Sequence, residues 1–133
     1  MFIKKVLEYS YNYAEYIVSD GKNDIICMCI SVPLADGKVP KTGMKIENVY
    51  VFSYGDLVVE KLGSGEPCIK KTENNYFGYE VQGEVSDTEN AIISVFGFKF
   101  SLAYYYPNGL PDSFNKGDLA RVFVDRFDCE IKI

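Results

Sequence analysis

Apolar and polar residues alternate along much of this chain with a period of two. Every second residue from 96 to 102 is apolar: Phe96, Phe98, Phe100 and Leu102. Near the end of the chain, Val122 and Val124 alternate with Arg121, Phe123 and Asp125. Successive side chains of a β-strand point to opposite faces, so both patterns predict strands with one buried face.

Other segments extend this prediction to the whole chain. Apolar runs of strand length at 24–32 and 46–53 are bounded by Gly, Pro or Asn. Residues 1–8 are the best helical candidate, but their pattern fits a first strand equally well. We count eight to ten candidate strands. The sequence predicts an all-β fold made of small barrels of the OB-like or SH3-like type.

One nine-residue stretch occurs twice, as VSDGKNDII at 18–26 and VSDTENAII at 85–93. In both copies Ser-Asp favours a turn and the following Asn accommodates a left-handed backbone, so each copy predicts a hairpin. Thr88 stands where the first copy has Gly21, which indicates that this position does not need a positive φ.

The similarity continues further along the chain. GMKIENVYVF at 43–52 and GDLARVFVD at 117–125 each place Gly before a Val-aromatic-Val segment. We predict two similar β halves from an internal duplication, 1–65 and 74–133, joined by a linker-like segment at 66–73. The alternatives are one joint domain, 1–133, and convergence on turn-forming residues. KGDLARVFVD also resembles the Lys-Gly-Asp entry to a strand in several OB-like domains; this resemblance covers ten residues and assigns no family.

Composition and net charge reduce the number of partner classes that this chain could bind. The chain has 11 Tyr, 9 Phe and no Trp, a bias that suits a pleated sheet surface. Its net charge is −5, and its basic residues are not clustered as phosphate binding requires. Duplex nucleic acid is therefore an unlikely partner. The chain has no secretory signal and no apolar run of about 18 residues, so we expect a cytoplasmic protein that does not enter a membrane.

The absence of histidine removes several chemistries, namely Ser-His-Asp and Cys-His catalysis and metal binding by imidazole. Four cysteines, Cys27, Cys29, Cys68 and Cys129, lack the Cys-x-x-Cys spacing of zinc knuckles. We expect buried thiols, no metal and no cofactor. The remaining catalytic option is an enzyme that uses carboxylates alone, with two acidic groups in a buried cleft.

Aromatic residues give two candidate binding sites. The segment SLAYYYPNGLPDSF carries Tyr104, Tyr105, Tyr106 and Phe114 in a long loop. Such a loop predicts recognition of another protein or of a second copy of the chain. This is the leading hypothesis: a non-catalytic binding module.

The alternative is an OB-like binder of a small ligand or of single-stranded nucleic acid. It uses Tyr9, Tyr11 and Tyr13 as a row on one strand face. Such a site needs lysines beside the row, and the paired candidates are Lys4, Lys5, Lys70 and Lys71. Ordinary packing with the hydroxyls at the surface would also explain the row.

Overall fold

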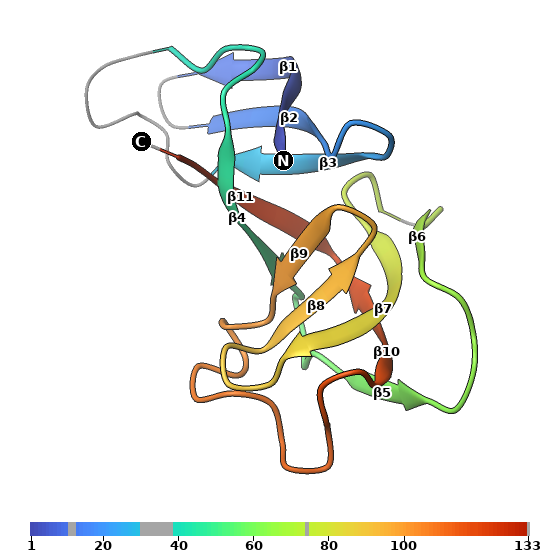
Figure 1. Ribbon diagram of the computed structural model, residues 1–133. Helices are drawn as coiled ribbons and strands as arrows, with labels where there is room; N and C mark the ends of the chain where they lie inside the picture. The colour runs from blue at the N-terminus through green and yellow to red at the C-terminus, as the bar shows by residue number, and fades with distance from the viewer. Residues whose placement is uncertain (11–12, 30–38, 74, 133) are drawn as a thin grey trace.

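The computed structural model describes residues 1–10, 13–29, 39–73 and 75–132. Within these residues it contains strands and no helix, so the predicted all-β class is confirmed (Figure 1). The eleven strands are β1 (Phe2–Ser10), β2 (Tyr13–Ser19), β3 (Asp24–Cys29), β4 (Ile46–Phe52), β5 (Val59–Leu62), β6 (Cys68–Lys71), β7 (Tyr79–Asp87), β8 (Ile92–Val95), β9 (Phe98–Ser101), β10 (Leu119–Val124) and β11 (Arg126–Ile131). No helix in the described ranges could span a membrane.

All eleven strands belong to one mixed sheet. Its order is β1-β2-β3-β11-β4-β9-β8-β7-β10-β5, and β6 pairs with β7 beside this path. β11, from the second part of the chain, therefore lies between β3 and β4, and β4, from the first part, lies between β11 and β9. The parallel pairs β3·β11 and β4·β9 both join strands that are far apart in the sequence.

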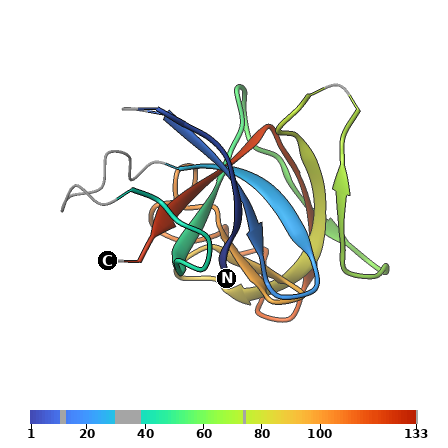
Figure 2. The ribbon, with the colours of Figure 1, turned by 90° about the horizontal axis from the view of Figure 1, so that it is seen from above.

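Two antiparallel meanders lie on either side of a central pair. β1–β3 form one meander and β7–β9 form the other. The antiparallel pair β4·β11 runs between them, and Figure 1 shows these two strands descending from the β1–β3 layer to the β7–β9 group. The view from above shows the same strands crossing the centre of the molecule (Figure 2). This central pair is where the outer-face residues described below gather.

The predicted closed barrel is not formed, because the sheet path ends at two separate edges, β1 and β5. A barrel needs its first and last strands to be neighbours. Here β1 and β5 do not pair with each other, and β1 bridges instead to the segment before β4. The bridge between Phe2 and Lys45 connects the edge strand β1 to the segment before β4. A 3.0 Å hydrogen bond from the Asp125 N–H to the Phe52 carbonyl extends the pairing of β4 with β11.

A stack of aromatic rings forms the centre of the core. The ring centroids of Phe98 and Phe100 are 5.5 Å apart, and those of Phe100 and Phe127 are 4.6 Å apart. Tyr79 continues the stack at 5.2 Å from Phe127. These distances are typical of favourable aromatic pairs. The stack joins β9, β11 and β7, so it ties the central pair to the second meander.

The alternation predicted at the end of the chain is confirmed. Val122 and Val124 are buried, and Phe123 is 57% exposed. The alternation predicted from residue 96 begins instead at Phe98, because Phe96 lies in the β8–β9 turn with a φ of 54° and is exposed. The N–H of the next residue, Gly97, donates to the Asp20 carboxylate at 2.8 Å, which fixes this turn.

The repeated stretches both form hairpins, as predicted. They lie at the turns β2–β3 and β7–β8. In each turn an aspartate accepts a hydrogen bond from the N–H of the Asn three residues later: Asn23 to Asp20 at 2.7 Å and Asn90 to Asp87 at 2.9 Å. The backbones differ, since Gly21 has a φ of 104° while the positive φ of the second turn falls on Ala91, at 53°. The prediction that this position does not need a positive φ therefore holds only for the second turn.

Part of the predicted linker is a strand. Residues 68–71 form β6, which pairs with the first half of β7 from Cys68↔Gln82 to Lys71↔Tyr79. The segment 66–73 is therefore attached to the sheet rather than extended between two units.

Candidate functional site

The outer face of the central pair β4·β11 carries a group of aromatic and charged side chains. We call this group the Arg126 strip; it consists of Tyr50, Phe52, Tyr54, Tyr104, Arg126 and Asp128. In the antiparallel register Arg126 lies opposite Phe52 and Asp128 lies opposite Tyr50. Directly opposite residues share a face of a sheet, and the alternate residues of the same strands are buried in the core. The strand pairing therefore places these side chains together.

Arg126 and Asp128 form a two-point ion pair. The Arg126 Nε lies 2.6 Å from Asp128 Oδ1 and its Nη2 lies 3.3 Å from Oδ2. The guanidinium also lies 4.0 Å from the centre of the Phe52 ring, within cation–π range. Burial alone would lower the pKa of Arg126, but the Asp128 carboxylate outweighs it and raises that pKa. Only 3% of Asp128 is exposed, so Arg126 compensates a charge that water does not reach.

Tyr104 completes the strip from the loop that follows β9. Its ring stacks on Tyr50 with centroids 5.1 Å apart and an angle of 11° between the planes. Its hydroxyl donates to Asp128 Oδ2 at 3.4 Å. Burial and the Asp128 carboxylate raise the pKa of Tyr104 to about 12. The ring is held in one position although Tyr104 is 46% exposed.

Tyr54 extends the strip at the end of β4 and is 74% exposed. Its ring contacts the Phe52 ring edge to face, with centroids 5.1 Å apart. The Asp125 carboxylate fixes its backbone by accepting from the Tyr54 N–H at 2.8 Å. Tyr54 and Tyr104 therefore present aromatic surface beside Arg126.

The four residues predicted to bind a partner have different roles in the structure. Tyr104 belongs to the strip. Tyr105 supports the loop, since its hydroxyl donates to the Ser53 carbonyl at 2.5 Å and accepts from the Ser53 N–H at 2.8 Å. Tyr106 and Phe114 are half-buried and pack against the core. Much of the aromatic loop thus covers the sheet, and one of its three consecutive tyrosines faces outward.

The predicted tyrosine row is not formed by its described members. Tyr9 is on β1 opposite Ala14, and Tyr13 begins β2 opposite Ser10. Because opposite residues share a face and neighbours alternate, Tyr9 and Tyr13 point to different faces. Tyr13 donates its hydroxyl to Glu15. Tyr11 lies outside the described residues.

The four lysines named with that row lie on two different strands, and two of them are already bound to other groups. Lys4 forms an ion pair with Asp24 at 2.7 Å. The ammonium of Lys71 donates to the carbonyl of Gly78 at 3.1 Å and to that of Asn75, and so holds the turn before β7. Lys5 and Lys70 are exposed on β1 and β6. These lysines do not form a cationic surface beside Tyr9.

The cysteines pack as predicted for small apolar residues. Cys27, Cys29 and Cys129 are buried in the core, and Cys68 is half-buried. Hydrogen bonding with Cys27, together with burial, raises the pKa of Cys129 well above that of an ordinary thiol. In the ranges that the structure describes, no cluster of Cys, Asp and Glu has the arrangement of a metal site.

A carboxylate-only enzyme would need an acidic group with a raised pKa. The Lys4 side chain lowers the pKa of Asp24 and the Asn90 side chain lowers that of Asp87. The N–H of Asn115 lowers the pKa of Asp118. These shifts run opposite to what a general acid requires, and they give that alternative no support.

Of the residues of the strip, Tyr104 alone is among the site residues predicted from the sequence. The sequence pattern predicts strands at 46–53 and 121–125, yet nothing in one sequence shows that β4 pairs with β11.

Comparison with protein-family models, with curated proteins and with solved structures finds no match to this chain.

Proposed function

We propose that this protein is a non-catalytic binding module that contacts another protein through the Arg126 strip. The observation that carries the proposal is Tyr104, which is half-exposed and yet fixed by Tyr50 and Asp128. A ring that is already fixed loses little conformational entropy when a partner covers it. Tyr and Arg are also the residues enriched where binding energy concentrates in protein interfaces.

The charges of the strip favour a protein over a nucleic acid. Arg126 is neutralised by Asp128, and the carboxylates of Asp125 and Glu130 lie on the same strand or next to it. A phosphate backbone would meet these acidic groups, and Arg126, the cation of the strip, is already paired. Exposed aromatic rings within a balanced polar surface instead match the composition of protein interfaces.

A capture experiment tests this proposal. Wild-type protein and the double variant Tyr54→Ser/Tyr104→Ser are used to capture proteins from a lysate of the source cell. The matched control is Tyr76→Ser/Phe123→Ser, which also removes two exposed rings. The surroundings of Phe123 match those of Phe52, because each ring lies beside an arginine that forms an ion pair. Arg121 lies 5.7 Å from the centre of the Phe123 ring and pairs with Glu60.

We expect one protein to be captured by wild type and by the control, and to be lost from the strip variant. Both double variants must unfold in urea at the same concentration as wild type within error. Equal capture by the strip variant, or loss only from the control, would contradict the role of the strip.

We also propose that the two parts of the chain arose by duplication and that each resembles a small OB-like unit. The repeated stretch forms the β2–β3 turn in one part and the β7–β8 turn in the other, and in each turn an Asp carboxylate accepts from the N–H of the Asn three residues later. In the turns before β4 and β10 a glycine N–H donates to a carbonyl of an earlier strand, although the two acceptors lie at different places in their strands. Gly43 N–H donates to the Ile3 carbonyl, and Gly117 N–H donates to the Val85 carbonyl, at 2.7 and 2.8 Å. The cytoplasmic location remains a prediction of the sequence.

A further inference from the structure

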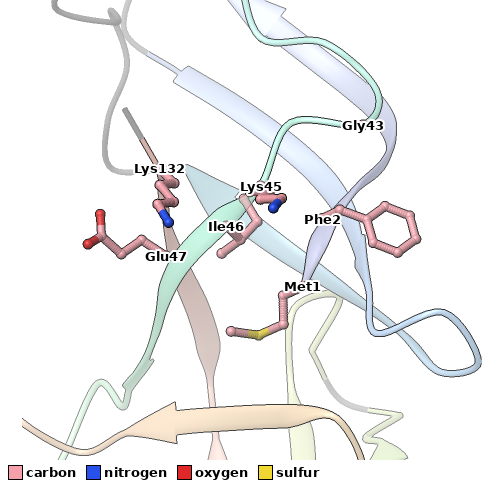
Figure 3. Close-up of a pocket in the computed structure, with 7 residues that line it drawn as sticks. All are labelled: Met1, Phe2, Gly43, Lys45, Ile46, Glu47 and Lys132. Carbon is pink, nitrogen blue, oxygen red and sulfur yellow. The ribbon is translucent and has the colours of Figure 1, made fainter.

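A hollow of about 560 Å³ lies where the start of β1 meets the segment before β4. Figure 3 shows the side chains that surround it, contributed by the start of β1, by residues 43–47 and by the end of the described chain. Backbone hydrogen bonds hold these segments together: Ile3 N–H to the Met44 carbonyl, and Ile46 N–H to the Met1 carbonyl, at 2.9 and 3.0 Å. The volume falls within the usual range for small-molecule sites.

Three side chains form a row across this hollow. Phe2 is bridged to Lys45, and the N–H of Lys132 donates to the Lys45 carbonyl at 2.9 Å. Lys132 continues the register in which Ile131 lies opposite Ile46. Directly opposite residues share a face, so Phe2, Lys45 and Lys132 project side by side, as Figure 3 shows.

The two lysines of this row lie on directly opposite backbone positions. Neither forms an ion pair within 4 Å in the described part of the chain, whereas Lys61 pairs with Asp118 and Arg121 with Glu60. Like charges directly opposite one another destabilise a sheet. The chain as a whole carries a net charge of −5, so this local excess of positive charge runs against the overall balance.

We infer that this hollow binds a small organic anion: a monocarboxylate with an apolar body. The carboxylate lies between the ammonium groups of Lys45 and Lys132 and relieves their repulsion. The apolar body lies against the ring of Phe2, which shares a face with the two lysines. Glu47 also lines the hollow, and its carboxylate repels a second negative charge on the ligand, which favours a monoanion over a dianion.

Three probes separate the parts of this inference. 2-Naphthoate has the anionic head and the apolar body, 2-naphthylmethylammonium has the same body with the opposite charge, and acetate has the head alone. Each is titrated into the full chain, and the amide shifts in ¹H–¹⁵N spectra report the affinity and the location. The test variant is Lys45→Met/Lys132→Met. The control Lys70→Met/Lys99→Met removes the same charge from exposed positions elsewhere.

We expect 2-naphthoate to bind wild type and the control equally, with shifts at residues 43–47 and 132. The test variant should bind at least about tenfold more weakly, and the other two probes should bind at least about tenfold more weakly than 2-naphthoate. Without ligand, the test variant should unfold at the same or a higher urea concentration than wild type, because a like-charge pair is gone.

Four results with the naphthyl probes would overturn the inference. They are no binding of 2-naphthoate, equal binding to the test variant, equal binding of the cationic probe, and amide shifts that map elsewhere. Acetate binding as tight as that of 2-naphthoate would remove the apolar body from the site and so would also overturn it as stated.

Discussion

The ion pair between Arg126 and Asp128 is the residue-scale feature on which the outer face depends. Asp128 is almost fully buried. Its carboxylate accepts hydrogen bonds from Arg126 Nε at 2.6 Å and from the Tyr104 hydroxyl at 3.4 Å. Removing one partner of such a pair leaves the other charge without compensation. The pair therefore holds the side chains of the strip in place even though its net contribution to the free energy of unfolding, compared with two apolar residues, is small.

We predict that Arg126→Met lowers the free energy of unfolding by about 2–3 kcal/mol, somewhat less than for a fully buried pair because Arg126 is partly exposed. Urea denaturation measures the change. Arg126→Met/Asp128→Val, which removes both charges, should recover at least half of the loss. A double variant less stable than Arg126→Met would contradict this account of the pair.

The burial or exposure of a side chain could be predicted from the sequence only where the alternation of a strand determines it. The burial of Val122 and Val124 and the exposure of Phe123 follow from alternation. Phe96 is exposed, although alternation predicts that it is buried, because it lies in a turn with a positive φ. A positive φ is uncommon for a phenylalanine, and the sequence gives no sign of it. The pairing of Arg126 with Asp128 needs the β11 backbone and was not predictable.

At the scale of elements, Asp20 connects two hairpins. Its carboxylate accepts from the N–H groups of Lys22 and Asn23 within its own turn, and from Gly97 in the β8–β9 turn. Burial alone would raise the pKa of Asp20, but these donors outweigh burial and lower it to about 2. The ionised form is therefore the one that stabilises the fold.

We predict that Asp20→Ala lowers the free energy of unfolding by about 1–2 kcal/mol at pH 7. The folded pKa is below the unfolded one, so this contribution is fully present above pH 4 and is lost as the pH falls through about 2. Urea denaturation at several pH values should show wild type and Asp20→Ala converging on acidification.

Asp87→Ala provides the matched control for this prediction. Asp87 occupies the same position in the repeated stretch and bonds to Asn90 within its own turn. We expect Asp87→Ala to destabilise less than Asp20→Ala at pH 7. A constant difference between wild type and Asp20→Ala from pH 7 to pH 2 would contradict the assigned role of the carboxylate.

Gly83 marks the point where β7 changes partner. β6 pairs with β7 up to Gln82, and β8 pairs from Glu84 onward. A Cβ on Gly83 would lie 2.4 Å from Val95 Cγ2 and 2.5 Å from the Ser94 carbonyl oxygen. The two strands approach too closely there for any other residue.

We predict that Gly83→Ala lowers the free energy of unfolding by about 2–3 kcal/mol, since the neighbouring strand must move. Gly55→Ala is the control, because a Cβ there meets no atom within 4 Å, and it should change stability by less than about 0.5 kcal/mol. Thermal unfolding followed by circular dichroism measures both. A Gly83→Ala protein as stable as Gly55→Ala would show that β8 can shift without cost.

The elements themselves were largely predictable, and their pairing was not. Periodicity and turn residues located β3, β4 and β10, and the repeated stretch located two hairpins. The sheet order depends on contacts between distant segments, such as β3 with β11, which alternation does not encode. β6 was missed because its four residues, CIKK, are too short and too charged to show a period.

At the scale of the whole molecule, the sheet interleaves the two parts of the chain. β4 lies between β11 and β9, and β11 lies between β3 and β4. A strand from one part therefore completes the sheet of the other part. If the two parts are duplicates, the second can take the place of the first.

We predict that two copies of 74–133, joined by residues 66–73, fold with a single cooperative transition in urea. The first copy's β10, which the Gly-led segments match to β4, would occupy the place of β4. The control carries Gly83→Ala in both copies and should be less stable. A tandem chain without a cooperative transition would contradict the duplication.

The most direct test of the proposed function is photo-crosslinking at position 104 in the source cell. A chain with benzoylphenylalanine in place of Tyr104 is irradiated beside a chain that carries the same group in place of Phe123. The Arg126 strip predicts a light-dependent adduct with one protein at position 104 and not at position 123. An adduct at 123 alone, or none at 104, would contradict the claim that the strip is where this protein meets its partner.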